Sequence, residues 1–266
     1  MIGVQVVAIT KNKNILVCGC SFTYDSGFTP DNFKSYHYTS VLSGRYPINF
    51  NNIAIGGMSN REIALRTIEN IALSLDHYDA VIVQWSSLSR WWYYTGQNNI
   101  DDFTGIVNGS AFGAGLATTD AKLLGKMLFT QFNNQYMLLK QWLLDCITLA
   151  RLLENKVPYR FCLGFDNLLS EFNNIEYSDG LKNLSEELVD ILDLQNRPDS
   201  YVLDKINVIK NLIAIVKQLN WINFPDKSWV ERSVDLSDDR QHPGMKSNLL
   251  WADSLEPFIS DLCLDK

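Results

Sequence analysis

Histidine is scarce in this chain of 266 residues, which contains only His37, His77 and His242. Three scattered histidines argue against a histidine-rich zinc or di-iron centre, because such a site would need nearly all of them. The five cysteines are odd in number and irregularly spaced, which is typical of reduced thiols rather than of a disulfide framework. A metal site at Cys18 and Cys20 would lack nearby cysteine partners, so we expect neither a metal nor a cofactor.

Basic residues are also in deficit: 23 Lys and Arg against 30 Asp and Glu give a net charge of −7. This balance argues against nucleic acid or an anionic membrane surface as a partner. The chain has no run of about 18 apolar residues, so we expect no transmembrane helix. Its first residues lack the basic and apolar segments of a secretory signal, and we therefore expect a cytoplasmic protein.

Two nucleotide-binding fingerprints are missing as well. Neither GxGxxG nor GxxxxGK[ST] occurs, which disfavours a nucleotide-binding α/β protein. Hydrophobic residues make up 46% of the chain, enough for a buried core, so intrinsic disorder is excluded. The length corresponds to one large domain or two small ones.

Short apolar runs alternate along the chain with longer segments of helical periodicity. Strands are expected at 14–20, 48–55, 79–85, 159–165 and 221–224, and helices at 33–46, 61–75, 138–153, 203–219 and 247–262. This alternation predicts an α/β fold with a parallel sheet covered on both faces. Two polar stretches, at about 93–133 and 166–200, are interpreted as insertions into a single domain spanning residues 1–266.

Three short motifs stand where strands or loops of such a sheet would end. Gly19-Cys20-Ser21-Phe22 follows the first strand, where a tight turn can present a serine hydroxyl beside backbone N–H groups. The glycine pair 56–57 follows the second strand and leaves a backbone N–H open to a ligand. Near the other end of the chain, Asp239 and His242 stand three residues apart, as a base and its orienting carboxylate could. Taken alone, each motif also fits a plain structural role: a helix cap, a turn and an exposed histidine.

Together and in this order, the motifs resemble the SGNH hydrolases, also called the GDSL esterase/lipase family. The first block carries Cys20 where the family has aspartate, Gly57 matches the glycine of the second block, and Asp239-x-x-His242 matches the last block. The forms GCSFT and AIGGMSN resemble a branch common in phage and bacterial genomes. The resemblance extends from about residue 14 to 262. It implies a three-layer α/β/α sandwich with a mostly parallel, five-stranded, flavodoxin-like sheet, and it implies no cofactor.

The resemblance also implies roles for the triad. Ser21 would attack an ester carbonyl, and His242 would take its proton and return it to the leaving alcohol. Asp239 would hold the imidazole of His242. His37 and His77 are expected to be structural, since they fall in or beside helices away from these motifs.

One departure concerns the oxyanion hole, to which Ser21 and Gly57 would donate their N–H groups. The family's third block adds an asparagine, whereas here Ser86 stands nearest that position, with Asn60 or Gln84 as substitutes. Losing one such donor typically costs about 10²–10³ in rate. A slow enzyme, a different oxyanion hole and a non-catalytic descendant therefore all stay open.

An aromatic cluster follows the third strand: Trp85, Arg90, Trp91 and Trp92. These side chains could stack on a sugar ring or cover an acyl chain; alternatively, they anchor the first insertion to the body. The chain lacks a long apolar lipid-binding segment. The expected substrate is therefore a carbohydrate or small ester that carries an acetyl or short acyl group.

Two other functions fit the same residues. An O-acyltransferase would use the same triad, because water and an acceptor alcohol compete for one acyl-enzyme. A non-catalytic binding or structural module on this fold, such as a phage accessory protein associated with the virion, is the other alternative.

Overall fold

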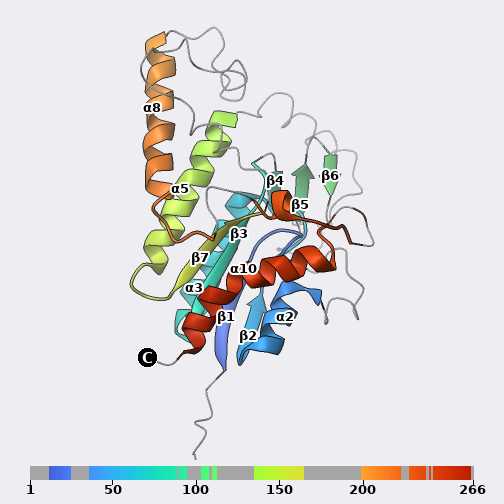
Figure 1. Cartoon of the computed structure of the whole chain (residues 1–266). Coiled ribbons are helices and arrows are strands. Elements are labelled where there is room, and N and C mark those ends of the chain that lie inside the picture. Colours follow the sequence, from blue (N-terminus) through green and yellow to red (C-terminus); the bar gives the residue numbers. More distant parts are fainter. Residues whose placement is uncertain are drawn as a thin grey trace, which may run out of the picture.

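A four-stranded parallel sheet forms the centre of the molecule, in the strand order β2-β1-β3-β7 (Figure 1). The computed structural model describes residues 12–24, 36–88, 90–94, 103–107, 110–112, 135–164, 199–222, 228–237, 240 and 242–264. The strands are β1 (Lys13–Cys18), β2 (Ile48–Asn52), β3 (Ala80–Trp85) and β7 (Tyr159–Leu163). The parallel α/β sheet expected from the alternating pattern is confirmed, with these four strands close to their expected positions.

Of the fifth expected strand, the described residues show a single bridge. Trp221 pairs in parallel with Phe161 of β7. The Ile222 N–H donates to the Phe161 carbonyl at 2.8 Å, and the Phe161 N–H donates to the Asn220 carbonyl at 2.8 Å. Residues 223–227 lie outside the described part of the chain, so the prediction of a strand over 221–224 is supported only at its start.

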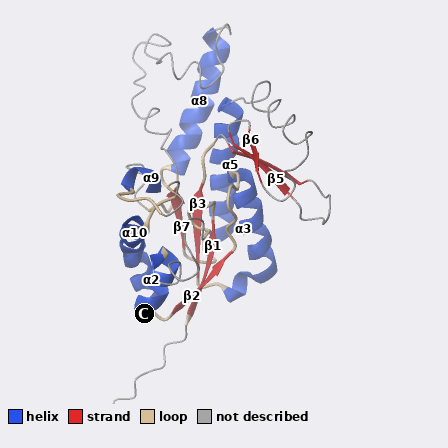
Figure 2. Ribbon diagram, turned by 90° about the vertical axis from the view of Figure 1, so that its right-hand side faces the viewer, coloured by secondary structure: helices blue, strands red, loops and turns tan. Residues whose placement is uncertain are grey.

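Helices cover both faces of the sheet, which gives the three layers expected. Figure 2 shows α2, α9 and α10 on one side of the sheet and α3 and α5 on the other; α8 extends toward the top of the view, in contact with α5. The helices are α2 (Tyr38–Arg45), α3 (Asn60–Ser74), α5 (Gln135–Leu153), α8 (Asp199–Val216), α9 (Trp229–Arg232) and α10 (Met245–Cys263). None of these described helices is both long and apolar enough to span a bilayer.

The strands are buried because both of their faces meet helices. All six residues of β3 are buried, and so are the last four of β1. Helix α3 begins where expected: the Ser59 hydroxyl accepts the Glu62 N–H at 3.3 Å, satisfying a backbone donor of the first turn. Ile63, Thr67 and Ile71 then form the buried stripe of α3.

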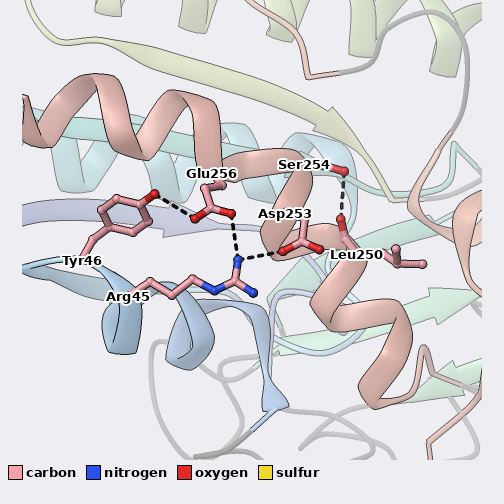
Figure 3. Close-up of polar contacts among 6 residues, drawn as sticks. All are labelled: Arg45, Tyr46, Leu250, Asp253, Ser254 and Glu256. Atoms are coloured by element: carbon pink, nitrogen blue, oxygen red, sulfur yellow. Dashed lines mark hydrogen bonds and ion pairs between the residues drawn. The ribbon is translucent and has the colours of Figure 1, made fainter.

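Helices α2 and α10 are joined across one outer layer by a small polar cluster (Figure 3). Arg45 NH1 lies 2.7 Å from Asp253 and 2.9 Å from Glu256. The Tyr46 hydroxyl donates to Glu256 at 2.8 Å. The cluster is largely exposed, so it fixes the pairing of the two helices more than it adds stability.

The first insertion has internal structure. Strands β4 (Arg90–Tyr94), β5 (Phe103–Val107) and β6 (Ser110–Phe112) form an antiparallel sheet in the order β4-β5-β6. The sequence did not predict these strands, because the segment is rich in Gly, Asn and Thr and has no clear alternation. The second insertion, at 166–200, lies almost wholly outside the described residues, and the interpretation as a single domain stays a prediction.

Two of the three histidines occupy structural positions. His37 is fully buried and caps α2, with its Nδ1 2.7 Å from the Thr39 hydroxyl. Burial lowers the pKa of His37 to about 3, so the folded protein holds it neutral. His77 ends the short 3₁₀ turn Leu75–His77 and is exposed.

We predict that His37 makes the protein sensitive to acid. Its pKa is about 3 in the folded protein against 6.5 in the unfolded chain. Between these two pH values, His37 is protonated in the unfolded chain and neutral in the folded protein. The free energy of unfolding therefore falls by up to about 1.4 kcal/mol for each pH unit of acidification. Urea denaturation across this window should show a shallower pH slope for His37→Asn than for the wild type. His77→Asn, the exposed control, should keep the wild-type slope; equal slopes for the wild type and His37→Asn would contradict the prediction.

Candidate active site

The turn after β1 carries Ser21. The N–H groups of Thr23 and Tyr24 both donate to the Cys20 carbonyl, at 3.0 and 2.9 Å, and close a tight turn. Ser21 lies within it and is only 7% exposed. A Cβ on Gly19 would stand 2.9 Å from the Cβ atoms of both Thr23 and Gln84, so this position has room only for glycine.

A buried glutamine lies against this turn. Gln84 Oε1 accepts the Thr23 hydroxyl at 2.7 Å and lies 3.5 Å from the Cys20 thiol. Tyr38 extends the network, with its hydroxyl 3.5 Å from that of Thr23. The Gln84 carbonyl oxygen is therefore bound to the turn and helps to position it. Its Nε2 is buried and has no hydrogen-bond partner among the described residues, so a role of Gln84 as an oxyanion donor stays a prediction. In the sequence, the positioning role of Gln84 could have been suspected because Gln84 is an uncharged polar residue in an otherwise apolar strand.

The segment after β2 runs along the same turn. The Ile53 N–H donates to the Val17 carbonyl at 2.9 Å, and Asn52 Nδ2 donates to the Thr23 carbonyl at 2.6 Å. The chain then turns between Ile55 and Met58, where Gly57 has a φ of 82°, in the left-handed region that favours glycine. The structure thus places the second motif beside the first, as expected for neighbouring parallel strands.

Ser86 and Asn60 meet at the end of β3. The Ser86 N–H donates to Asn60 Oδ1 at 2.6 Å, and Asn60 Nδ2 donates to the Ser86 carbonyl at 3.0 Å. The Ser86 hydroxyl is buried and has no hydrogen-bond partner among the described residues. Asn60 thus holds the backbone of Ser86, while the Ser86 hydroxyl keeps its donor unused.

His242 comes to this edge from the far end of the chain. It sits in a hairpin in which the Ser237 N–H donates to the His242 carbonyl at 2.8 Å and Leu236 bridges Pro243. The imidazole lies against the ring of Phe22, the residue after Ser21, with ring centroids 5.7 Å apart at 86°. Asp239, the expected orienting carboxylate, lies outside the described residues.

The sequence did not predict that Asp235 and Asn248 hold this hairpin in place. Asp235 accepts the N–H groups of Lys246 and Ser247 at 3.0 and 2.8 Å, at the start of α10. Burial opposes ionisation of Asp235, but the hydrogen bonds from Ser247 and Lys246 outweigh it and lower its pKa. Asn248 adds a second anchor, donating to the Pro243 carbonyl at 3.2 Å. Asp235 stands ten residues before α10 in the sequence, so no local capping pattern indicated this contact.

Trp85 does not contact a ligand in this arrangement, and that prediction is wrong. The side chain is fully buried and packs edge-on against Trp142 and Phe161, at centroid distances of 6.5 and 5.4 Å. Both faces of β3 are covered, so a large side chain on either face enters the core. Trp85 therefore belongs to the core of the sheet, and these two contacts do not join it to the first insertion.

The rest of the aromatic cluster lies on β4. Arg90 begins this strand and lines a pocket of about 260 Å³ together with Asn60. The backbone at Trp91 and Trp92 pairs with β5, but their side chains lie outside the described part of the structure, so a role in substrate binding stays a prediction.

The cysteines are free thiols, and four of the five are buried. Burial raises the pKa of Cys18 to about 11, so this thiol is not a nucleophile at neutral pH. Within the described residues, no three His, Cys, Asp or Glu side chains lie close enough to hold a metal ion.

Comparison with known proteins gave structural likenesses only. No family model and no curated protein matches the chain. Among solved structures, TesA is similar over 94% of this chain and 99% of its own, with 11% identity and a TM-score of 0.46. A catalytic mutant of an acetylxylan esterase from Geobacillus stearothermophilus covers 94% of this chain and 95% of its own, with 12% identity and a TM-score of 0.45.

A lipase/acylhydrolase from Enterococcus faecalis is also similar, over 94% of this chain and 95% of its own, at 10% identity and a TM-score of 0.41. At such identities and TM-scores, these likenesses say nothing about the reaction of this chain.

We predict that the turn tolerates no side chain at Gly19. In Gly19→Ala the new methyl group meets Thr23 and Gln84, and relieving the overlap should cost roughly 1–3 kcal/mol of unfolding free energy. Gly44→Ala is the matched control: it lies in α2 with nothing within 4 Å of the new Cβ, and should stabilise by about 0.5–1 kcal/mol. Urea denaturation measures both, and a Gly19→Ala protein as stable as Gly44→Ala would refute the tight packing of the turn.

Proposed function

We propose that this protein hydrolyses esters, with Ser21 as the nucleophile and His242 as the general base. The observation that carries the proposal is the packing of the His242 imidazole against Phe22, the residue that follows Ser21. Ser21 lies on a tight turn at a strand end, and the imidazole from a distant loop packs against the next residue. The proposed pair would therefore lie at one edge of a parallel sheet, where active sites of such sheets form.

In the proposed reaction, Ser21 Oγ attacks the ester carbonyl as His242 takes the hydroxyl proton. His242 then protonates the leaving alcohol, and water releases the acyl group by the reverse sequence. Asp239 would hold the imidazole in the required tautomer. Under this proposal the reaction uses only side chains and backbone groups of the chain.

The oxyanion would be bound by the N–H groups of Ser21 and Gly57 and by the Ser86 hydroxyl. The last assignment is supported by two observations: the Ser86 hydroxyl has no partner among the described residues, and its backbone is clamped by Asn60. A donor held in place before the reaction stabilises developing charge without reorganisation.

A small apolar pocket supports an acyl group of limited size. Phe22 and Pro243, the neighbours of the proposed nucleophile and base, line a pocket of about 310 Å³ with Val230, Val234 and Leu236. This volume is at the lower end of the roughly 300–1,000 Å³ typical of ligand sites. We therefore propose an acetyl or other short acyl group on a carbohydrate or small alcohol.

Loss of either proposed catalytic residue should abolish turnover. We predict that Ser21→Ala and His242→Ala each lower kcat for p-nitrophenyl acetate by about 10⁴-fold or more, because both act in one unit. A fluorophosphonate probe should label the wild type and not Ser21→Ala, with His77→Ala as the matched control that keeps activity. A wild type that is neither labelled nor active would point instead to a non-catalytic module.

The Ser86 hydroxyl should affect kcat and not KM. We predict that Ser86→Ala lowers kcat by about 10²–10³-fold and leaves KM nearly unchanged, because the donor acts on charge formed in the transition state. Ser254→Ala is the control: its hydroxyl bonds to the Leu250 carbonyl at 2.9 Å on the outer side of α10 (Figure 3) and its loss should not affect kcat. Equal kcat values for the wild type and Ser86→Ala would remove Ser86 from the oxyanion hole.

A further inference from the structure

A second pocket, which has several polar side chains in its wall, lies beside the proposed site. It has a volume of about 260 Å³ and is bounded by the start of α3, the start of β4 and one face of α5. Asn60, which clamps the backbone of Ser86, is part of its wall. The pocket therefore adjoins the end of β3, and the reaction proposed above uses none of its other side chains.

The wall that α5 contributes contains a buried carboxylate with one oxygen unused. Asp145 Oδ1 accepts Arg61 NH1 at 2.5 Å and Gln141 Nε2 at 3.0 Å. Asp145 Oδ2 is buried and has no hydrogen-bond partner among the described residues. Buried oxygens are nearly always paired in native proteins, so an unpaired one in a pocket wall indicates a missing donor.

A buried donor lies three residues before Asp145 on α5. The indole N–H of Trp142 is also buried without a partner among the described residues, and Trp142 lines the same pocket. Arg61 closes the solvent side: its side chain is 55% exposed, whereas that of Asp145 is 4% exposed. Arg61 can therefore move to admit a ligand without disturbing the core.

These groups select a neutral, hydroxyl-bearing ligand. An anion would meet the Asp145 carboxylate, and a cation would meet the guanidinium groups of Arg61 and Arg90, which also lines the pocket. A hydroxyl group both donates and accepts, so a pair of neighbouring hydroxyls can satisfy Asp145 Oδ2 and the Trp142 N–H together. A hydrocarbon would leave both of them unpaired at a cost.

We propose that this pocket, formed by Arg61, Gln141, Trp142 and Asp145, binds the polyhydroxylated, uncharged alcohol portion of the ester substrate. The proposal rests on the ester hydrolysis proposed above for its place in the reaction. The binding itself can be tested without turnover. The pocket beside Phe22 would then receive the acyl group.

The first experiment measures binding in the Ser21→Ala protein, which cannot turn substrate over. Saturation-transfer NMR with methyl glucoside as the probe should give signals that are lost in Ser21→Ala/Asp145→Asn and in Ser21→Ala/Gln141→Leu. Gln141 is exposed, so its change tests the pocket without risk to folding. Cyclohexanol, a ring with a single hydroxyl, should give no comparable signal. Absence of methyl glucoside binding in the parent protein would overturn the subsite, whatever the catalytic result.

The second experiment measures selectivity in the active protein. The ratio of kcat/KM for acetylated methyl glucoside to that for p-nitrophenyl acetate should fall about tenfold in Asp145→Asn and in Gln141→Leu, the loss of roughly one hydrogen bond. Arg151→Ala, which removes an exposed ion pair with Glu154 on the same helix, should leave the ratio unchanged. Turnover of both esters with an unchanged ratio in the pocket variants would overturn the subsite and leave ester hydrolysis standing. Binding of methyl glucoside without turnover of either ester would leave the subsite standing and overturn ester hydrolysis.

Discussion

The hydrogen bond from Thr23 to Gln84 joins the turn that carries Ser21 to the central strand beside it, and the geometry of the site depends on it. Thr23 is fully buried and Gln84 is 1% exposed, so water does not compete for this contact. In such surroundings a neutral hydrogen bond avoids the large desolvation cost of a buried ion pair. Two adjacent strands thereby hold the turn of Ser21 through neutral groups.

The same solution recurs at each strand end of the site. Asn52 at the end of β2 donates to the Thr23 carbonyl at 2.6 Å and accepts the Ala54 N–H at 3.1 Å. Asn60 makes two hydrogen bonds to the backbone of Ser86. A carboxamide both donates and accepts, so one side chain can hold a stretch of backbone at two points. Asn52, Asn60 and Gln84 thus supply side-chain hydrogen bonds where the strands end and the backbone ladder of the sheet no longer provides them.

Much of this arrangement could be predicted from local sequence. Apolar periodicity located the four strands and most of the helices, and parallel pairing then requires that Ser21 and Gly57 meet at one edge. The contact of His242 with Phe22 could not be predicted from periodicity, since it joins opposite ends of the chain. Only the resemblance to a family suggested it. Trp85 was misjudged because an aromatic residue at a strand end was interpreted by its neighbours in sequence, whereas burial on both faces of β3 decides its position.

The proposed base, His242, and the proposed nucleophile, Ser21, are held by different means. The turn of Ser21 is fixed from within the sheet, by groups that are almost fully buried. The hairpin of His242 is fixed from outside, through Asp235 and Asn248 at the start of α10. Asn248 also accepts the Tyr38 N–H at 3.3 Å, so the hairpin, α10 and α2 share one set of contacts. Because the Asp235 contact with Lys246 is exposed, whereas the contact of Thr23 with Gln84 is buried, local opening would displace His242 before Ser21 while the core stays folded.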